Sequence, residues 1–91
     1  AGSSITSGSA NTLFGYNAGS AITTGDGNTG FGKDALELNT SGVNTAFGGN
    51  ALAAVTSGTS NTAVGQDALT ANTASRNTAV GALALSKYDW R

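Results

Sequence analysis

Residues 44–52 read NTAFGGNAL, and variants of this stretch recur along the whole chain. The Asn-Thr pair that opens it stands in register at five places, and successive pairs are 17, 16, 17 and 16 residues apart. The five asparagines, which we call the Asn column, are Asn11, Asn28, Asn44, Asn61 and Asn77. A fixed short period across a chain is the signature of a tandem-repeat fold.

A bulky apolar residue stands three positions after each of these asparagines, and a glycine follows it every time. These apolar residues, called here the apolar column, are Phe14, Phe31, Phe47, Val64 and Val80. If the column points inward it fills the core, and if it points outward it is too apolar to stay exposed and marks a subunit interface. The sequence leaves both alternatives open, and each gives the column a structural role.

The repeat length selects the type of fold. Sixteen or seventeen residues at ~3.3 Å per residue trace a path of roughly 55 Å, which suits one flattened coil of two short strands and two turns. Helical repeats need about 30 residues or more, and frequent glycine opposes a helix. The sequence therefore predicts an all-β, parallel β-solenoid (β-roll) of about five two-strand coils, oligomeric because so thin a core is weak alone.

Two further columns predict how the coils are held. Stacking at ~4.8 Å would align the Asn column into a side-chain amide ladder, as in cross-β stacks. Two residues after the first four of these glycines stands an Asx residue that tolerates a left-handed backbone in a turn. These turn positions are Asn17, Asp34, Asn50 and Asp67.

The chain divides into three parts. Residues 1–10 form an N-terminal half-repeat, residues 11–85 form the tandem repeats, and residues 86–91 are a tail outside the pattern. The half-units at the two ends are complementary, which predicts head-to-tail stacking of copies. Aromatic residues are favoured interface anchors, so Tyr88, Trp90 and Arg91 are the expected assembly latch. The alternative is a fragment of a longer fibre whose repeats continue on both sides.

Composition narrows the classes of partner. A net charge of −1 with four scattered cations gives no footprint for nucleic acid. No apolar stretch approaches the ~20 residues that span a bilayer, so no membrane insertion is expected. With no cysteine and no histidine, and with five dispersed carboxylates, the chain offers no nucleophile–base pair. We therefore expect no enzyme activity, no metal and no cofactor.

Four other kinds of site are suggested by local patterns. Residues 25–30 match G-x-G-x-x-G, but no amphipathic helix follows them as a dinucleotide site requires. Calcium between Asx-rich coils needs a denser Gly-Asp pattern than this one. The regular threonines leave a binding module for glycan or ice, using surface Thr/Asn rows or loops, as the alternative function. Asn39-Thr40-Ser41 also matches a glycosylation sequon.

A family resemblance enters on residues 44–48 and 61–65, each followed by Ala-Leu. These units resemble the degenerate repeats of bacteriophage tail-fibre shafts, and they are similar to the β-roll heads of YadA-type trimeric adhesins. The resemblance covers residues 5–85 and implies an extracellular, cell-surface or virion location. It implies a fibre-forming structural protein whose partner is itself, as a head-to-tail filament or a homotrimer, with a cell-surface glycan as a further possible partner.

Overall fold

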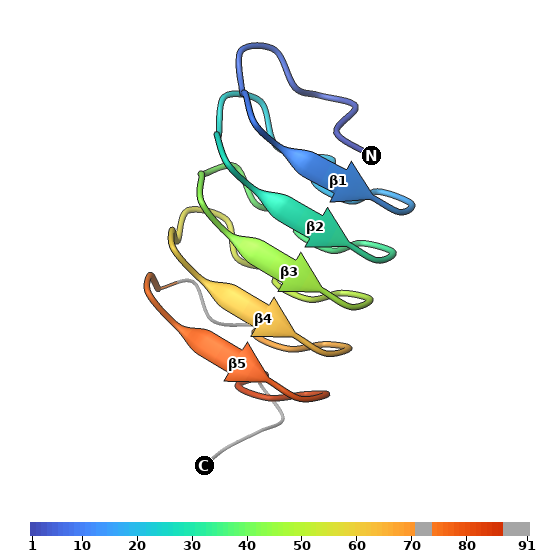
Figure 1. The fold of residues 1–91 in the computed structure, drawn as a ribbon, viewed down its shortest axis with the longest axis vertical. Helices are drawn as coiled ribbons and strands as arrows, with labels where there is room; N and C mark the ends of the chain where they lie inside the picture. The colour runs from blue at the N-terminus through green and yellow to red at the C-terminus, as the bar shows by residue number, and fades with distance from the viewer. Residues whose placement is uncertain (71–73, 87–91) are drawn as a thin grey trace.

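The computed structural model describes residues 1–70 and 74–86, which wind into a β-solenoid with one coil per repeat (Figure 1). Five strands form one sheet in the order β1-β2-β3-β4-β5, and every neighbouring pair is parallel. Their bounds are Thr12–Phe14 (β1), Thr29–Phe31 (β2), Thr45–Phe47 (β3), Thr62–Val64 (β4) and Thr78–Val80 (β5). The all-β parallel solenoid predicted from the repeat is confirmed.

Each coil contains one strand, so the prediction of two strands per coil is wrong. The half that follows each strand is made of turns, because the backbone there enters the left-handed region twice. Asn17 and Gly19 have φ of 58° and 59° in the first coil. They are the third residues of the turns closed by Ala18 N–H to Gly15 O (3.2 Å) and Ser20 N–H to Asn17 O (3.1 Å). A positive φ at that position is the mark of a type II turn, which a continuous strand cannot contain.

The leucine column adopts this left-handed backbone although leucine rarely does. Leu36, Leu52 and Leu69 have φ of 58°, 55° and 53°, and all three side chains are fully buried. Burial of a leucine side chain contributes about 2 kcal/mol, enough to offset a left-handed residue that costs roughly 1–2 kcal/mol. Glycine at the equivalent position 19 was the signal in the sequence that this column needs a positive φ.

The core is a narrow column of small and medium side chains between the sheet and the turns. The middle residue of each strand points inward, as Ala46 and Ala63 do with no exposed surface. The alanine that closes each first turn and the leucine after it pack beneath the sheet. The buried members of these two columns are Ala18, Ala35, Ala51, Ala68, Leu36, Leu52 and Leu69.

In the first two coils, one large core residue is accommodated by two glycines. Leu13 stands where later strands have alanine, and its methyl groups occupy the space over Gly19, where a Cβ would lie 2.7 Å from Leu13 Cδ1. Gly30 in β2 likewise leaves room for Leu13 and Leu36, whose methyl groups would lie 3.2 and 3.1 Å from an added Cβ. The departures from the repeat at positions 13, 19 and 30 therefore compensate one another.

The glycine after each strand lets successive coils approach closely. Gly48 has φ of 132°, and a Cβ built on it would lie 2.6 Å from the carbonyl carbon and oxygen of Gly65. No side chain fits at that distance, so the spacing of the coils depends on glycine at this column.

The half-repeat at residues 1–10 lies on the first full coil. Gly2 N–H donates to Ala18 O at 2.9 Å, and Thr6 N–H donates to Thr23 O at 2.9 Å. The tail from residue 87 onward, with the expected latch at Tyr88, Trp90 and Arg91, lies outside the described residues.

Candidate functional site: the outer face of the sheet

The apolar column lies on the outside of the solenoid. Residues alternate between the two faces of a strand, so the inward middle residue of each strand puts its neighbours outward. Phe14 and Val80 are 71% and 70% exposed, and Phe47 and Val64 are 42% and 39% exposed. Of the two orientations left open by the sequence, the outward one is therefore observed.

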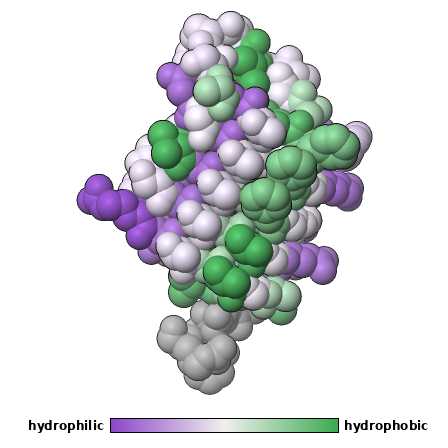
Figure 2. All heavy atoms as spheres, in the orientation of Figure 1, coloured by the Kyte–Doolittle hydropathy of each residue, from purple (hydrophilic) through white to green (hydrophobic). Residues whose placement is uncertain are grey.

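The phenyl rings of the column stack along the solenoid. The centroids of Phe14 and Phe31 are 5.8 Å apart with an interplanar angle of 13°, and those of Phe31 and Phe47 are 4.9 Å apart at 6°. The parallel register places each ring over the next and brings Val64 directly beside Phe47. The column is thus a continuous apolar ridge, and Figure 2 shows apolar side chains in a band across this face.

A column of threonines and a column of mixed residues border the ridge. The strand-opening threonines share the outer face with it, and Thr12 and Thr78 are exposed while the three between them are partly buried. On the other side lie the residues two positions past the ridge, which stack through bonds such as Asp34 N–H to Tyr16 O at 2.8 Å. This border column consists of Tyr16, Lys33, Gly49, Gln66 and Ala82. An apolar centre with a polar border is the composition of a protein interface.

The Asn column lies inside the solenoid and binds one coil to the next. Each Oδ1 accepts the backbone N–H of the next asparagine along the column, at 2.8–3.0 Å, from Asn11 through to Asn77. Each Nδ2 from Asn11 to Asn61 donates to a carbonyl three residues before the next asparagine, at 2.9 Å. The side chains therefore bond to backbone groups, and not to one another as in the amide ladder that we expected.

Burial removes the Asn column from any recognition surface. Asn28 and Asn44 have no exposed surface, and Asn61 has 1%. Because both polar atoms of Asn28 and of Asn44 are bonded within the fold, the Asn column does not form a surface row available to a ligand.

Asn39, the sequon asparagine, is also buried. It has no exposed surface, and its Nδ2 donates to Val55 O at 3.0 Å while its Oδ1 has no partner among the described residues. A glycosyltransferase requires an accessible asparagine, so the folded coil does not present this sequon.

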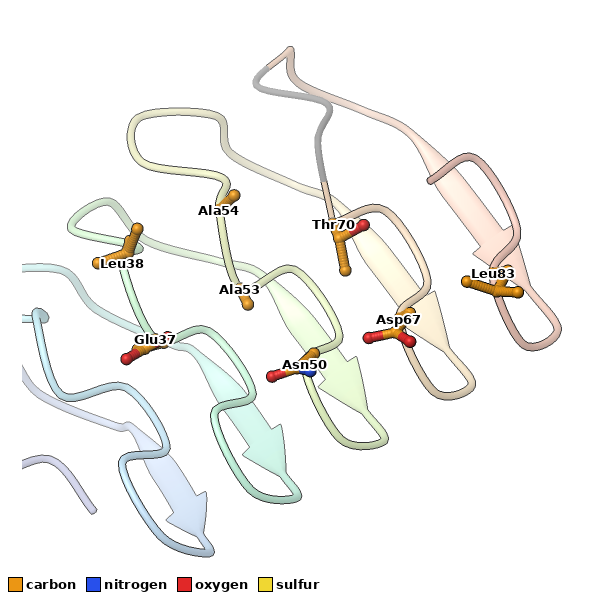
Figure 3. A pocket seen from close by; sticks show the side chains of 8 residues that line it. All are labelled: Glu37, Leu38, Asn50, Ala53, Ala54, Asp67, Thr70 and Leu83. Carbon is orange, nitrogen blue, oxygen red and sulfur yellow. The ribbon is translucent and has the colours of Figure 1, made fainter. Parts of the chain in front are cut away.

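A shallow groove of about 320 Å³ runs along the turn side of the solenoid (Figure 3). Successive coils contribute to it, with Glu37, Asn50, Asp67 and Thr70 as its polar groups. The remaining lining residues are Leu38, Ala53, Ala54 and Leu83. The groove therefore combines carboxylate, amide and hydroxyl groups with an apolar floor.

The G-x-G-x-x-G segment is part of the coil. Asn28 belongs to the Asn column, and Gly30 lies in β2 with its Cα facing the core beside Leu36. Within residues 1–70 and 74–86, no three Asp, Glu, His or Cys residues gather as a metal site. The same residues include no helix long and apolar enough to cross a membrane.

Comparison with protein-family models, with curated proteins and with solved structures gives no match to this chain. The functional argument accordingly rests on the coil, its outer face and its groove.

Proposed function

We propose that this chain is a structural segment of a fibre, built from stacked β-solenoid coils and assembling with further copies of itself. The observation that carries the proposal is the sameness of every step along the stack. From coil to coil the structure repeats the same parallel pairing and the same asparagine-to-backbone bond.

A step of this kind can be continued indefinitely. Each coil presents backbone N–H and C=O groups at its upper and lower edges, and such edges template the addition of another strand. Each Asn column bond joins a side chain on one coil to the backbone of the next. A further coil can therefore donate its asparagine N–H to the Oδ1 of the coil before it, as every coil in the chain does. The added coil can come from the same chain or from another copy.

The exposed ridge supports a role in assembly. Monomeric soluble proteins rarely leave a long contiguous apolar surface in water, and such surfaces mark protein or membrane contacts. The ridge is bordered by threonine and by residues such as Lys33, which is a rim composition suited to a protein partner. We place the fibre outside the cell or on a virion, in line with the resemblance of the repeat to tail-fibre shafts and adhesin heads.

Two measurements on the 91-residue chain test this proposal. Light scattering gives the mass of the particles, and small-angle X-ray scattering gives their length. We expect the mass to rise with concentration in multiples of 8.8 kDa and the maximum dimension to exceed the 38 Å of one chain. A particle of 8.8 kDa and about 38 Å at every concentration would overturn the proposal.

The groove favours a second candidate function, recognition of a glycan. Sugar hydroxyls pair with carboxylates and amides, and the less polar ring faces fit a floor such as Ala53 and Leu83. A glycan array with the wild-type chain and with Asp67→Asn tests it. Signals that the substitution removes would support the candidate, and an array without signals would overturn it.

A further inference from the structure

The residues along the outer face differ in size from one end of the solenoid to the other. In the ridge, the first three coils carry phenylalanine and the last two carry valine. In the border column, the first coil carries Tyr16 and the last carries Ala82, while the middle coil carries Gly49. The face is therefore bulky at its N-terminal end and slight at its C-terminal end.

From this asymmetry we infer that two copies pack face to face and antiparallel, related by a two-fold axis that lies between the two sheets and runs parallel to β3. The inference rests on the proposed function, since it names how one copy of the fibre segment meets another beside it. A two-fold interface brings the same surface of both copies together, so that each residue i of one copy meets residue j of the other and the reverse.

Antiparallel pairing matches large residues with small ones at both ends. Phe14 of one copy faces Val80 of the other, and Phe31 faces Val64. In the border column Tyr16 faces Ala82, and the long side chain of Lys33 faces the amide of Gln66. Phe14 and Val80 are 71% and 70% exposed, so both members of the outermost pair are available for contact.

The middle coil meets itself in this arrangement. Phe47 faces the second Phe47, which makes the largest pair of the ridge, and Gly49 faces the second Gly49 directly beside it. The absence of a side chain at residue 49 leaves room for two phenyl rings to pack side by side. Size is therefore balanced across all five coils.

A parallel pair gives the opposite result. Phe14 would meet Phe14 at one end of the interface, and Val80 would meet Val80 at the other. The two large phenyl rings would keep the copies apart and leave a gap between the valines near β5. Interfaces pack as densely as protein interiors, and such a gap forfeits contact.

The sheet is continuous across all five coils, and Figure 1, which looks down the shortest dimension of the molecule, shows its strands side by side. The ridge and the border column therefore present one uninterrupted face to a second copy.

Single cysteines and a short bismaleimide cross-linker test the orientation, because the chain has no cysteine of its own. Phe14 and Val80 lie four coil steps apart, roughly 19 Å at ~4.8 Å per step, so a short linker cannot confuse the two ends. We expect Phe14→Cys mixed with Val80→Cys to give cross-linked dimers, each variant alone to give none, and Phe47→Cys alone to dimerise. Phe47→Cys is the deciding sample, because two copies stacked end to end hold their Phe47 residues about five coil steps, roughly 24 Å, apart. Dimers of Phe14→Cys alone, or no dimers of Phe47→Cys, would overturn the inference.

A size-swap series provides an independent measurement. Val80→Phe should weaken the pair about tenfold by placing two phenyl rings at one end, and Phe14→Val combined with Val80→Phe should restore it. If the double variant is weaker than the single one, the antiparallel pairing is wrong. Growth in particle length reports the fibre role separately, so a chain that lengthens but cross-links in the parallel pattern refutes only the orientation.

Discussion

At the scale of single residues, the fold depends on side chains that bond to the backbone of the neighbouring coil. Asn28 is the clearest case, because its Oδ1 accepts Asn44 N–H at 3.0 Å and its Nδ2 donates to Ser41 O at 2.9 Å in a fully buried position. A buried polar group left without its partner costs about 1–3 kcal/mol.

Asn28→Ala should therefore lower the free energy of unfolding by about 2–4 kcal/mol, because two backbone groups lose their partner. Asn77→Ala is the matched control, since the bond described for its side chain is a 3.4 Å contact with Ser75 O. That substitution should cost less than about 1 kcal/mol. Chemical denaturation measures both, and equal losses would contradict the role of the Asn column.

Glycine at the end of each strand provides a second test at this scale. Gly48→Ala should lower the free energy of unfolding by about 3 kcal/mol or more, because the new methyl group collides with the backbone of Gly65 and φ is left-handed. Gly49→Ala is the adjacent control, with its nearest contact at 3.8 Å to Lys33 O. In the dilute, unpaired chain this substitution should change the free energy of unfolding by less than about 1 kcal/mol. Thermal unfolding of the two variants compares them, and an equally stable Gly48→Ala would refute the close approach.

Several residues could be read from the sequence, and others could not. The turn-forming Asx column is confirmed by φ of 58–63° at Asn17, Asp34, Asn50 and Asp67. The left-handed leucines were missed, because intrinsic preference argues against such a backbone and only burial favours it. Burial depends on which face is inside, and a pattern of alternating residues does not specify that.

At the scale of elements, the strand pairing follows the register that the repeat predicts, with threonine on threonine and alanine on alanine in β3 and β4. The expected second strand is absent because an Asx residue and a leucine or glycine, two positions apart, both take positive φ. The repeat period of the sequence predicted the length of a coil correctly. It did not predict that the second half of the coil consists of turns.

The outward ridge gives the prediction that belongs to the sheet. Phe31→Asp combined with Phe47→Asp should abolish association through the ridge and leave the coil folded and able to stack end to end, because neither side chain fills the core. Leu38→Asp with Val43→Asp is the matched control, since these residues are also exposed and lie outside the strands. Sedimentation measures association and circular dichroism measures folding. If the first variant associates as the wild type does, or the control alone dissociates, the ridge is not the interface.

At the scale of the whole molecule, the coils stack into an elongated solenoid with extents of 38 × 23 × 15 Å, and the strands run across the direction of stacking. Successive strands in a sheet are ~4.8 Å apart, so this spacing must run along the solenoid and along any fibre made by stacking solenoids. The domain division at residues 10 and 85 stays a prediction, as do the latch, the location outside the cell and the absence of enzyme activity.

Electron microscopy with diffraction from aligned particles tests the central claim most directly. We predict particles much longer than the 38 Å of one chain, with a ~4.8 Å repeat parallel to their length. Compact particles no longer than one chain, or elongated ones whose ~4.8 Å repeat runs across their length, would contradict a fibre of stacked coils.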